Sequence, residues 1–351
     1  MGKGARVRDI RPGGKVEGLF CVSEKALRTT RNGAPFLVLT LSDNTGQIEA
    51  RVWDNAQELG SGFDKGDIIF IEADAVEFNG QCQLKVNRCE QALDEEIDPS
   101  HFLPVSPCDL KKAWQVCSKA IKRVKEPNLA LVLKEIFSDK ATKKAFKEAP
   151  AAKRMHHAYI GGLLEHSASL VELVGLVVNR YPHLHSDLLV SASLLHDIGK
   201  IRELSWARPP IDYTDEGRLL GHIQLGVEII DSACKGLGIS CNSENILALK
   251  HIVLSHHGQK EFGSPVLPMT EEAVVFHMLD DLDAKLNFLS GLKMARGETK
   301  SWGWSDYQHL FERFFFLPPF SMQETDEKAT EQGIHKGKGP IQPTLWDTDE
   351  S

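Results

Sequence analysis

Five helix-like stretches of the chain place a histidine or an aspartate where an apolar side chain would be expected. His166 lies three residues after Leu163 and four before Leu170, which puts it on the apolar stripe of a helix. A single such histidine is more often a core residue whose nitrogens are hydrogen-bonded. An inward carboxylate is costly unless a counter-charge lies beside it. We therefore expect an all-α domain whose helices converge on a divalent cation. The inward residues are His166, His196, Asp197, His222, His256, His257 and Asp280.

The adjacent pair His196 and Asp197 is the most informative of these positions. It offers a neutral imidazole and a carboxylate able to bridge two ions, and Lys200 follows three residues later. An ammonium group at that spacing suits a phosphate. Mixed histidine and carboxylate ligation fits Mn²⁺, Co²⁺ or Fe²⁺ better than Mg²⁺. We expect Mn²⁺ as the first choice.

The order of these residues, H, HD, H, HH and D, resembles that of the HD-domain metal-dependent phosphohydrolases. A closer resemblance is to the YhaM family of 3′-5′ exoribonucleases. It is carried by three segments and covers the chain from about Val7 to Pro318. The segments are residues 156–166 (HHAYIGGLLEH), residues 255–268 (SHHG, then GSP and Pro268) and residues 277–285, which end in LDAK.

This resemblance implies which residues bind each of two metal ions and which contact the substrate. One ion would be held by His166, His196, Asp197 and Asp280, and Asp197 would bridge to a second ion held by His222, His256 and His257. Lys200 would neutralise phosphate oxygens, and His157 would contact the substrate or the leaving group. The expected reaction removes nucleoside 5′-monophosphates from the 3′ end of single-stranded RNA. Single-stranded DNA stays open as a substrate, and so does the choice among Asp280, Asp281 and Asp283 as the ligand.

The first 90 residues have the pattern of a small β-barrel. Five short segments rich in β-branched or aromatic residues are separated by turn sequences such as Asn32-Gly33 and Asn79-Gly80. A short polar helix near residues 55–59 follows the third segment. This is the arrangement of an OB fold, which binds single-stranded nucleic acid. The expected strands are residues 15–22, 35–41, 47–53, 67–76 and 81–88.

The barrel supplies aromatic and basic side chains for nucleic-acid binding. Such proteins stack bases on aromatic rings beside a basic groove. For any one aromatic residue, the barrel core is the more frequent role. The alternation in residues 47–53 leaves the orientation of Arg51 and Trp53 open at this point. The candidates are Phe20, Phe36, Arg51, Trp53 and Lys85.

The predicted fold class is a multi-domain α+β protein, with a five-stranded OB-fold barrel followed by an all-α HD domain. We expect the barrel in residues 1–95, a linker in 96–107, the HD domain in 108–318 and a disordered tail in 319–351. Although the net charge is −8, residues 108–154 hold 13 basic and five acidic residues, a local charge of +8. That stretch is equally consistent with phosphate contacts and with solvated helix faces.

Composition indicates a cytoplasmic protein. We find no apolar segment long enough to span a membrane and no apolar leader after Met1. Seven cysteines without a C-x-x-C pair fit a reducing compartment. A homo-oligomer stays open. The apolar cluster Gln342 to Trp346 in the tail could dock a protein partner, although one Leu-Trp pair is weak evidence.

Two other functions remain compatible with the sequence. A nucleotide phosphohydrolase would use the same ions on small nucleotides, with the barrel as a regulatory appendage. A replication-associated single-strand-binding protein would bind DNA and cleave nothing, although the complete ligand set argues against it.

Overall fold

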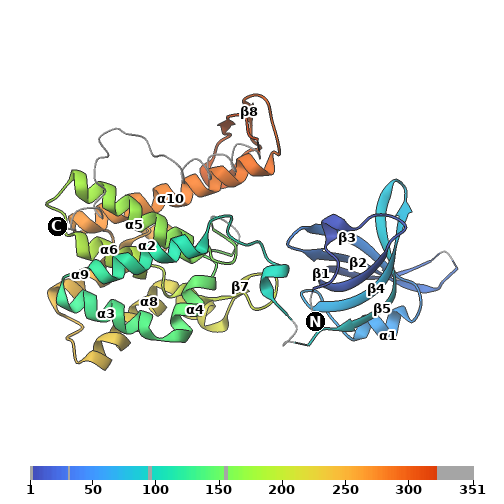
Figure 1. The fold of residues 1–351 in the computed structure, drawn as a ribbon, viewed down its shortest axis with the longest axis horizontal. Coiled ribbons are helices and arrows are strands. Elements are labelled where there is room, and N and C mark those ends of the chain that lie inside the picture. Colours follow the sequence, from blue (N-terminus) through green and yellow to red (C-terminus); the bar gives the residue numbers. More distant parts are fainter. Residues whose placement is uncertain (1–2, 31, 94–96, 154–156, 322–351) are drawn as a thin grey trace.

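The computed structural model describes residues 3–30, 32–93, 97–153 and 157–321, and it has two parts (Figure 1). A β-barrel comes first, and a helical part follows it along the chain. The predicted fold class is confirmed. Residues 319–321 of the expected tail are described, and Phe320 forms a β-bridge with Thr299. The rest of that tail with Gln342 to Trp346, together with Arg154 and His156, lies outside the described residues.

The barrel is closed by five strands in the order β1-β2-β3-β5-β4. Alternate side chains fill its interior, and Ile48, Ala50 and Val52 of β3 are buried, so Arg51 between them points outward. A short helix, α1 (Ala56–Ser61), follows β3 as the sequence predicts. The strands are β1 (Lys15–Thr29), β2 (Pro35–Asp43), β3 (Gly46–Val52), β4 (Ile68–Phe78) and β5 (Gln81–Gln91).

Several strands extend beyond their predicted ends. β1 pairs with β2 as far as Thr29, seven residues past the predicted end at Val22. A bulge between Val22 and Glu24 shifts the register there, and the residues beyond it are mostly exposed. Pairing without burial leaves no apolar pattern, which is why the sequence did not reveal this extension.

The helical part packs around one large apolar core. Helix α6 is buried from Leu188 to Leu195, and side-chain caps begin several other helices, as at Thr270 before α10. The helices are α2 (Leu110–Arg123), α3 (Pro127–Ser138), α4 (Lys140–Glu148), α5 (Gly162–Arg180), α6 (Ser186–Leu195), α7 (Lys200–Glu203), α8 (Asp215–Leu237), α9 (Glu244–Ser255) and α10 (Glu271–Ala295).

Short elements complete the chain. A two-stranded hairpin, β6 (Leu204–Ser205) and β7 (Asp212–Tyr213), projects between the two parts, and Arg208 in its loop lies 3.6 Å from Asp67 of the barrel (Figure 1). A second hairpin, β8 (Gly303–Trp304) with β9 (Phe316–Leu317), follows α10. No helix in the described ranges is both long and apolar enough to cross a membrane.

Gly199 sets how closely the turn after α6 approaches α8. A Cβ atom at Gly199 would lie 2.0 Å from the carbonyl oxygen of His222 and 2.6 Å from the backbone nitrogen of Gly226. Because both obstacles are backbone atoms, they cannot move aside as a flexible side chain would. The absence of a side chain at Gly199 therefore brings His196 and Asp197 next to His222.

Candidate metal centre

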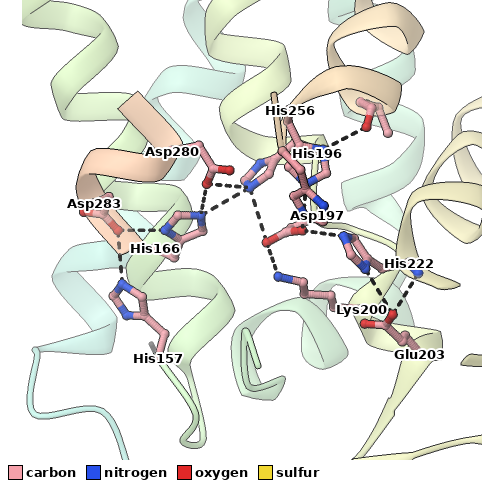
Figure 2. Close-up of polar contacts among 12 residues, drawn as sticks. His157, His166, His196, Asp197, Lys200, Glu203, His222, His256, Asp280 and Asp283 are labelled. Atoms are coloured by element: carbon pink, nitrogen blue, oxygen red, sulfur yellow. Dashed lines mark hydrogen bonds and ion pairs between the residues drawn. The ribbon is translucent and has the colours of Figure 1, made fainter. Parts of the chain in front are cut away.

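Five helices bring all seven predicted metal ligands to one place in the helical part, and Figure 2 labels all of them except His257. α5 contributes His166, α8 contributes His222 and α10 contributes Asp280. The pair His196 and Asp197 follows the end of α6, and the pair His256 and His257 follows the end of α9. Two trios form compact groups, and within each trio the ligand atoms lie within 4.8 Å of one another. The trios are His166 with His196 and Asp197, and His222 with His256 and His257.

The first cluster gathers around the Nε2 atom of His166. This atom lies 3.0 Å from Oδ1 of Asp280 and 3.2 Å from Nε2 of His196. Nε2 of His196 in turn lies 3.3 Å from Oδ2 of Asp197. Two imidazole nitrogens and two carboxylate oxygens thus face one point, which is the donor set of a divalent transition-metal ion.

The second cluster contains buried polar atoms without a hydrogen-bond partner. They are Oδ1 of Asp197, Nε2 of His222 and Nε2 of His256. The carboxylate oxygen lies 3.5 Å from the first nitrogen and 3.7 Å from the second. Burying three polar atoms unpaired is costly, and it becomes favourable when a cation lies between them. His257 faces the same group.

Hydrogen bonds fix the orientation of every ligand imidazole. In each ring Nδ1 donates to a protein oxygen, so Nε2 is left to bind a metal. The Nδ1 partners are Asp283 for His166 at 2.7 Å, Ala192 O for His196 at 3.2 Å, Glu203 for His222 at 3.0 Å, Val253 O for His256 at 2.8 Å and Phe262 O for His257 at 2.8 Å.

The protonation of the cluster also indicates a site for positive charge. Burial on its own would lower the pKa of His166, but hydrogen bonds to Asp280 and Asp283 outweigh it and raise the pKa to about 10. Burial would raise the pKa of Asp197, yet Lys200 and His196 hold it well below the usual range. Burial followed by neighbouring imidazoles lowers the pKa of His256. The ionised Asp197 and the neutral His256 are in the protonation states that metal binding requires, whereas His166 would lose its proton when an ion binds.

Lys200 lies beside the proposed bridging carboxylate. Its ammonium nitrogen is 2.5 Å from Oδ2 of Asp197, and the residue is buried. Lys200 and Asp280 also line a cavity of about 200 Å³ that opens over both clusters, with His277 and Phe262 in its wall. A phosphate group in this cavity would meet the lysine and the metal ligands together.

His157 is in the right region but not in the predicted role. The family resemblance implies contact with the substrate, yet His157 is 3% exposed and lies below Asp283 and His166 (Figure 2). Its Nε2 atom is 3.1 Å from Oδ2 of Asp283, and its Nδ1 atom is 3.0 Å from the Tyr159 hydroxyl. Because both ring nitrogens contact protein atoms away from the cavity, the expectation of substrate contact was wrong.

Two carboxylates support the centre from outside the proposed ligand set. Asp283 was left open as a ligand by the sequence, and Glu203 was missed. Asp283 accepts hydrogen bonds from His157, His166 and Ser169, and Glu203 accepts from the ring and the backbone of His222. They flank the row of ligands at its two ends (Figure 2). Asp283 follows Asp280 by three residues, hence on the same helix face, and that spacing was the signal available in the sequence.

The barrel residues divide into four that are exposed or half-buried and one that is fully buried. The Phe36 and Trp53 rings stack with centroids 4.8 Å apart, and Trp53 is 41% exposed. Arg51 faces outward on β3 and pairs in register with the exposed Lys85 of β5. Phe20, in contrast, is completely buried in the barrel core. Its assignment to the binding face was wrong because β1 is apolar on both faces at this point.

Comparison with known proteins agrees with both parts of the structure. Residues 5–92 match the OB-fold nucleic acid binding domain, and residues 163–285 match the HD domain. The chain is 38% identical over 298 residues to the 3′-5′ exoribonuclease YhaM of Geobacillus sp. (strain WCH70), covering 84% of this chain and 90% of that protein. It is 37% identical over 292 residues to YhaM of Bacillus pumilus (strain SAFR-032), covering 82% and 90%. The chain therefore belongs to the YhaM family of HD-domain hydrolases.

Proposed function

We propose that the protein is a metal-dependent 3′-5′ exoribonuclease that releases nucleoside 5′-monophosphates from single-stranded RNA. The observation that carries this proposal is the second cluster, where three buried polar atoms without hydrogen-bond partners converge beside a complete first cluster. Both relatives carry the name 3′-5′ exoribonuclease, which supports the direction and the substrate.

The first cluster (His166, His196, Asp197 and Asp280) would hold one ion, and the second (Asp197, His222, His256 and His257) would hold another. Divalent cations in such a site activate water at neutral pH and neutralise charge on a phosphodiester. Asp197 offers its two carboxylate oxygens to different clusters, since Oδ2 faces His196 and Oδ1 faces His222. Five imidazoles and two carboxylates favour Mn²⁺, with Co²⁺ and Fe²⁺ as related choices.

The residues around the ions would position the substrate for an attack. Lys200 lies at the cavity wall, where its ammonium group can pair with a non-bridging phosphate oxygen. Its present partner, Asp197, would share its negative charge with the cations, which frees the ammonium for the phosphate. Glu203 and Asp283 keep His222 and His166 in the orientation that presents Nε2.

The barrel would capture the single strand that the helical part cleaves. The stacked pair Phe36 and Trp53 offers an aromatic surface, and Arg51 and Lys85 offer positive charge beside it. Lys111, Lys112, Lys119 and Lys122 are exposed along α2 and would add phosphate contacts. Stacking and phosphate contacts do not depend on sequence, which suits an enzyme that degrades a strand processively or in successive steps.

A direct test uses a 5′-labelled single-stranded oligomer, made once as RNA and once as DNA, incubated with Mn²⁺ and with a chelator. The proposal expects RNA products shorter by successive single nucleotides, release of 5′-monophosphates, and no reaction with chelator. Internal fragments, shortening from the 5′ end, or faster turnover of free dinucleotides than of oligomers would refute it. DNA measured in parallel gives the sugar preference.

A further inference from the structure

Phe262 is an aromatic side chain at the metal centre for which the mechanism above has no use. It is 70% exposed, and it lines the cavity of about 200 Å³ together with Lys200, His257 and Asp280. A single exposed apolar ring is common on protein surfaces and does not by itself indicate a functional site. Here the residue lines the cavity that four of the proposed ligands also line, so its ring is near whatever enters.

The loop that carries Phe262 is tied to a metal ligand. The carbonyl oxygen of Phe262 accepts the hydrogen bond from Nδ1 of His257 at 2.8 Å. Gly258 and Gly263 bracket the loop with φ of +78° and +97°, and the backbone nitrogen of Ser264 donates to Gln259 O at 3.2 Å. The backbone that carries the aromatic side chain is therefore fixed relative to the second cluster by a short covalent and hydrogen-bonded path.

The size of the cavity limits its occupant. Sites for drug-sized ligands usually have volumes of about 300 to 1,000 Å³, so a volume of about 200 Å³ suits a single nucleoside. An exonuclease must hold one terminal nucleoside beyond the scissile phosphate, while the rest of the strand leads away. The wall offers an exposed aromatic face, and aromatic faces stack on any of the four bases.

We propose that Phe262 stacks on the base of the 3′-terminal nucleotide and thereby positions the terminal phosphodiester over the metal ligands. This inference rests on the proposed exoribonuclease function and names the part of the substrate that the cavity holds. It predicts that the enzyme senses whether the last nucleotide carries a base, and that the sensing residue is Phe262 rather than the aromatic pair of the barrel.

The test compares three 5′-labelled RNA oligomers of equal length in the Mn²⁺-loaded, full-length protein. One is intact, one has an abasic ribose at the 3′ end, and one has an abasic ribose at the penultimate position. The measurement is kcat/KM for the first cleavage. In the wild type, loss of the terminal base should lower it by roughly five- to a hundredfold, the effect of one lost stacking contact.

Three variants assign this effect to a residue. Phe262→Ala should lower kcat/KM on intact RNA by a similar factor, show no further loss with the terminal abasic RNA, and keep its bound Mn²⁺ by elemental analysis. Phe262→Trp should restore the preference for a terminal base. Phe314→Ala removes a comparably exposed ring, 55% exposed and outside the cavity lining, and should behave as the wild type.

The outcomes separate the two proposals. A wild type that does not shorten RNA overturns the exoribonuclease function and this inference with it. A wild type that shortens RNA but is indifferent to the terminal base overturns the inference alone. The inference also fails if the terminal-base effect survives in Phe262→Ala, or if that variant instead loses an effect of the penultimate base.

Discussion

At the scale of single residues, the centre depends on carboxylates that bind no ion in the proposed scheme. Asp283 accepts from Nδ1 of His166 at 2.7 Å and from Nε2 of His157 at 3.1 Å. Such partners orient the ligand ring and increase its basicity. The long row from His157 to Glu203 in Figure 2 is thus joined by hydrogen bonds and ion pairs, with the proposed metal ligands in its middle.

Asp283→Asn should therefore weaken the first cluster without removing a ligand. An amide presents hydrogen atoms to donors that now face a carboxylate, so the His166 ring loses its fixed orientation. We expect metal affinity or activity to fall by about 10- to 100-fold. Titration of metal-free protein with Mn²⁺ measures this change. Asp281→Asn is the matched control, since the half-exposed Asp281 carboxylate pairs with Lys285 on the same helix. Equal affinities for the two variants would contradict this role.

The choice of Asp280 as the ligand gives a second prediction at this scale. Its Oδ1 atom lies 3.0 Å from Nε2 of His166, whereas Oδ2 of Asp281 lies 2.6 Å from the Lys285 ammonium. Asp280→Ala should lower the metal content per chain in elemental analysis, and Asp281→Ala should leave it unchanged. A loss of metal in the Asp281 variant with full metal in the Asp280 variant would refute the assignment.

At the scale of secondary-structure elements, the site depends on how closely the α6 end approaches α8. Gly199→Ala would place a methyl carbon 2.0 Å from the His222 carbonyl oxygen, so the two elements must separate. We expect a lower melting temperature and a loss of activity. Gly236→Ala is the control, because Gly236 lies in α8 and a methyl group there would meet no atom within 4 Å. That change should stabilise the fold by about 0.5 to 1 kcal/mol. A Gly199→Ala protein as stable and active as the wild type would contradict the close packing.

The elements also show what the sequence could and could not predict. The clustering of the proposed metal ligands was predictable, because several of them interrupt an apolar stripe that is visible in a single sequence and because their order resembles that of a known family. The burial of Phe20 in the barrel core was not predictable. Residues 19–22 are all buried, so no alternation of buried and exposed positions marks which side chains face the core. Glu203 was missed because it binds His222 across two helices, and no spacing along the chain encodes that contact.

At the scale of the whole molecule, the barrel and the helical part divide capture from cleavage in the proposed function. The stacked pair Phe36 and Trp53 lies in the barrel, and all proposed ligands lie in the helical part. Both parts occur together in the relatives, since the match covers 90% of the length of each. Binding by the barrel should therefore depend on substrate length, whereas hydrolysis at the metal centre should not.

Trp53→Ala should reveal this division. Removing a stacking ring weakens binding of a long single strand by about 1 to 3 kcal/mol, while hydrolysis of a dinucleotide should change little. Activity measured against substrates of increasing length should thus become less dependent on length. Tyr181→Ala, which removes an exposed ring of the helical part, should keep the wild-type length dependence. An unchanged length profile in the Trp53 variant would assign the barrel to another partner.

The most direct test of the account counts ions and activity together. Metal-free protein is titrated with Mn²⁺ while elemental analysis gives ions per chain and a 5′-labelled RNA reports 3′ shortening. We expect two bound ions per wild-type chain, with activity rising as the second ion is taken up. Asp197→Asn removes the negative charge shared by the two clusters, so it should bind fewer ions and lose cleavage, yet still bind RNA through the barrel. Full cleavage by Asp197→Asn, or full wild-type activity with a single ion per chain, would contradict the two-ion centre.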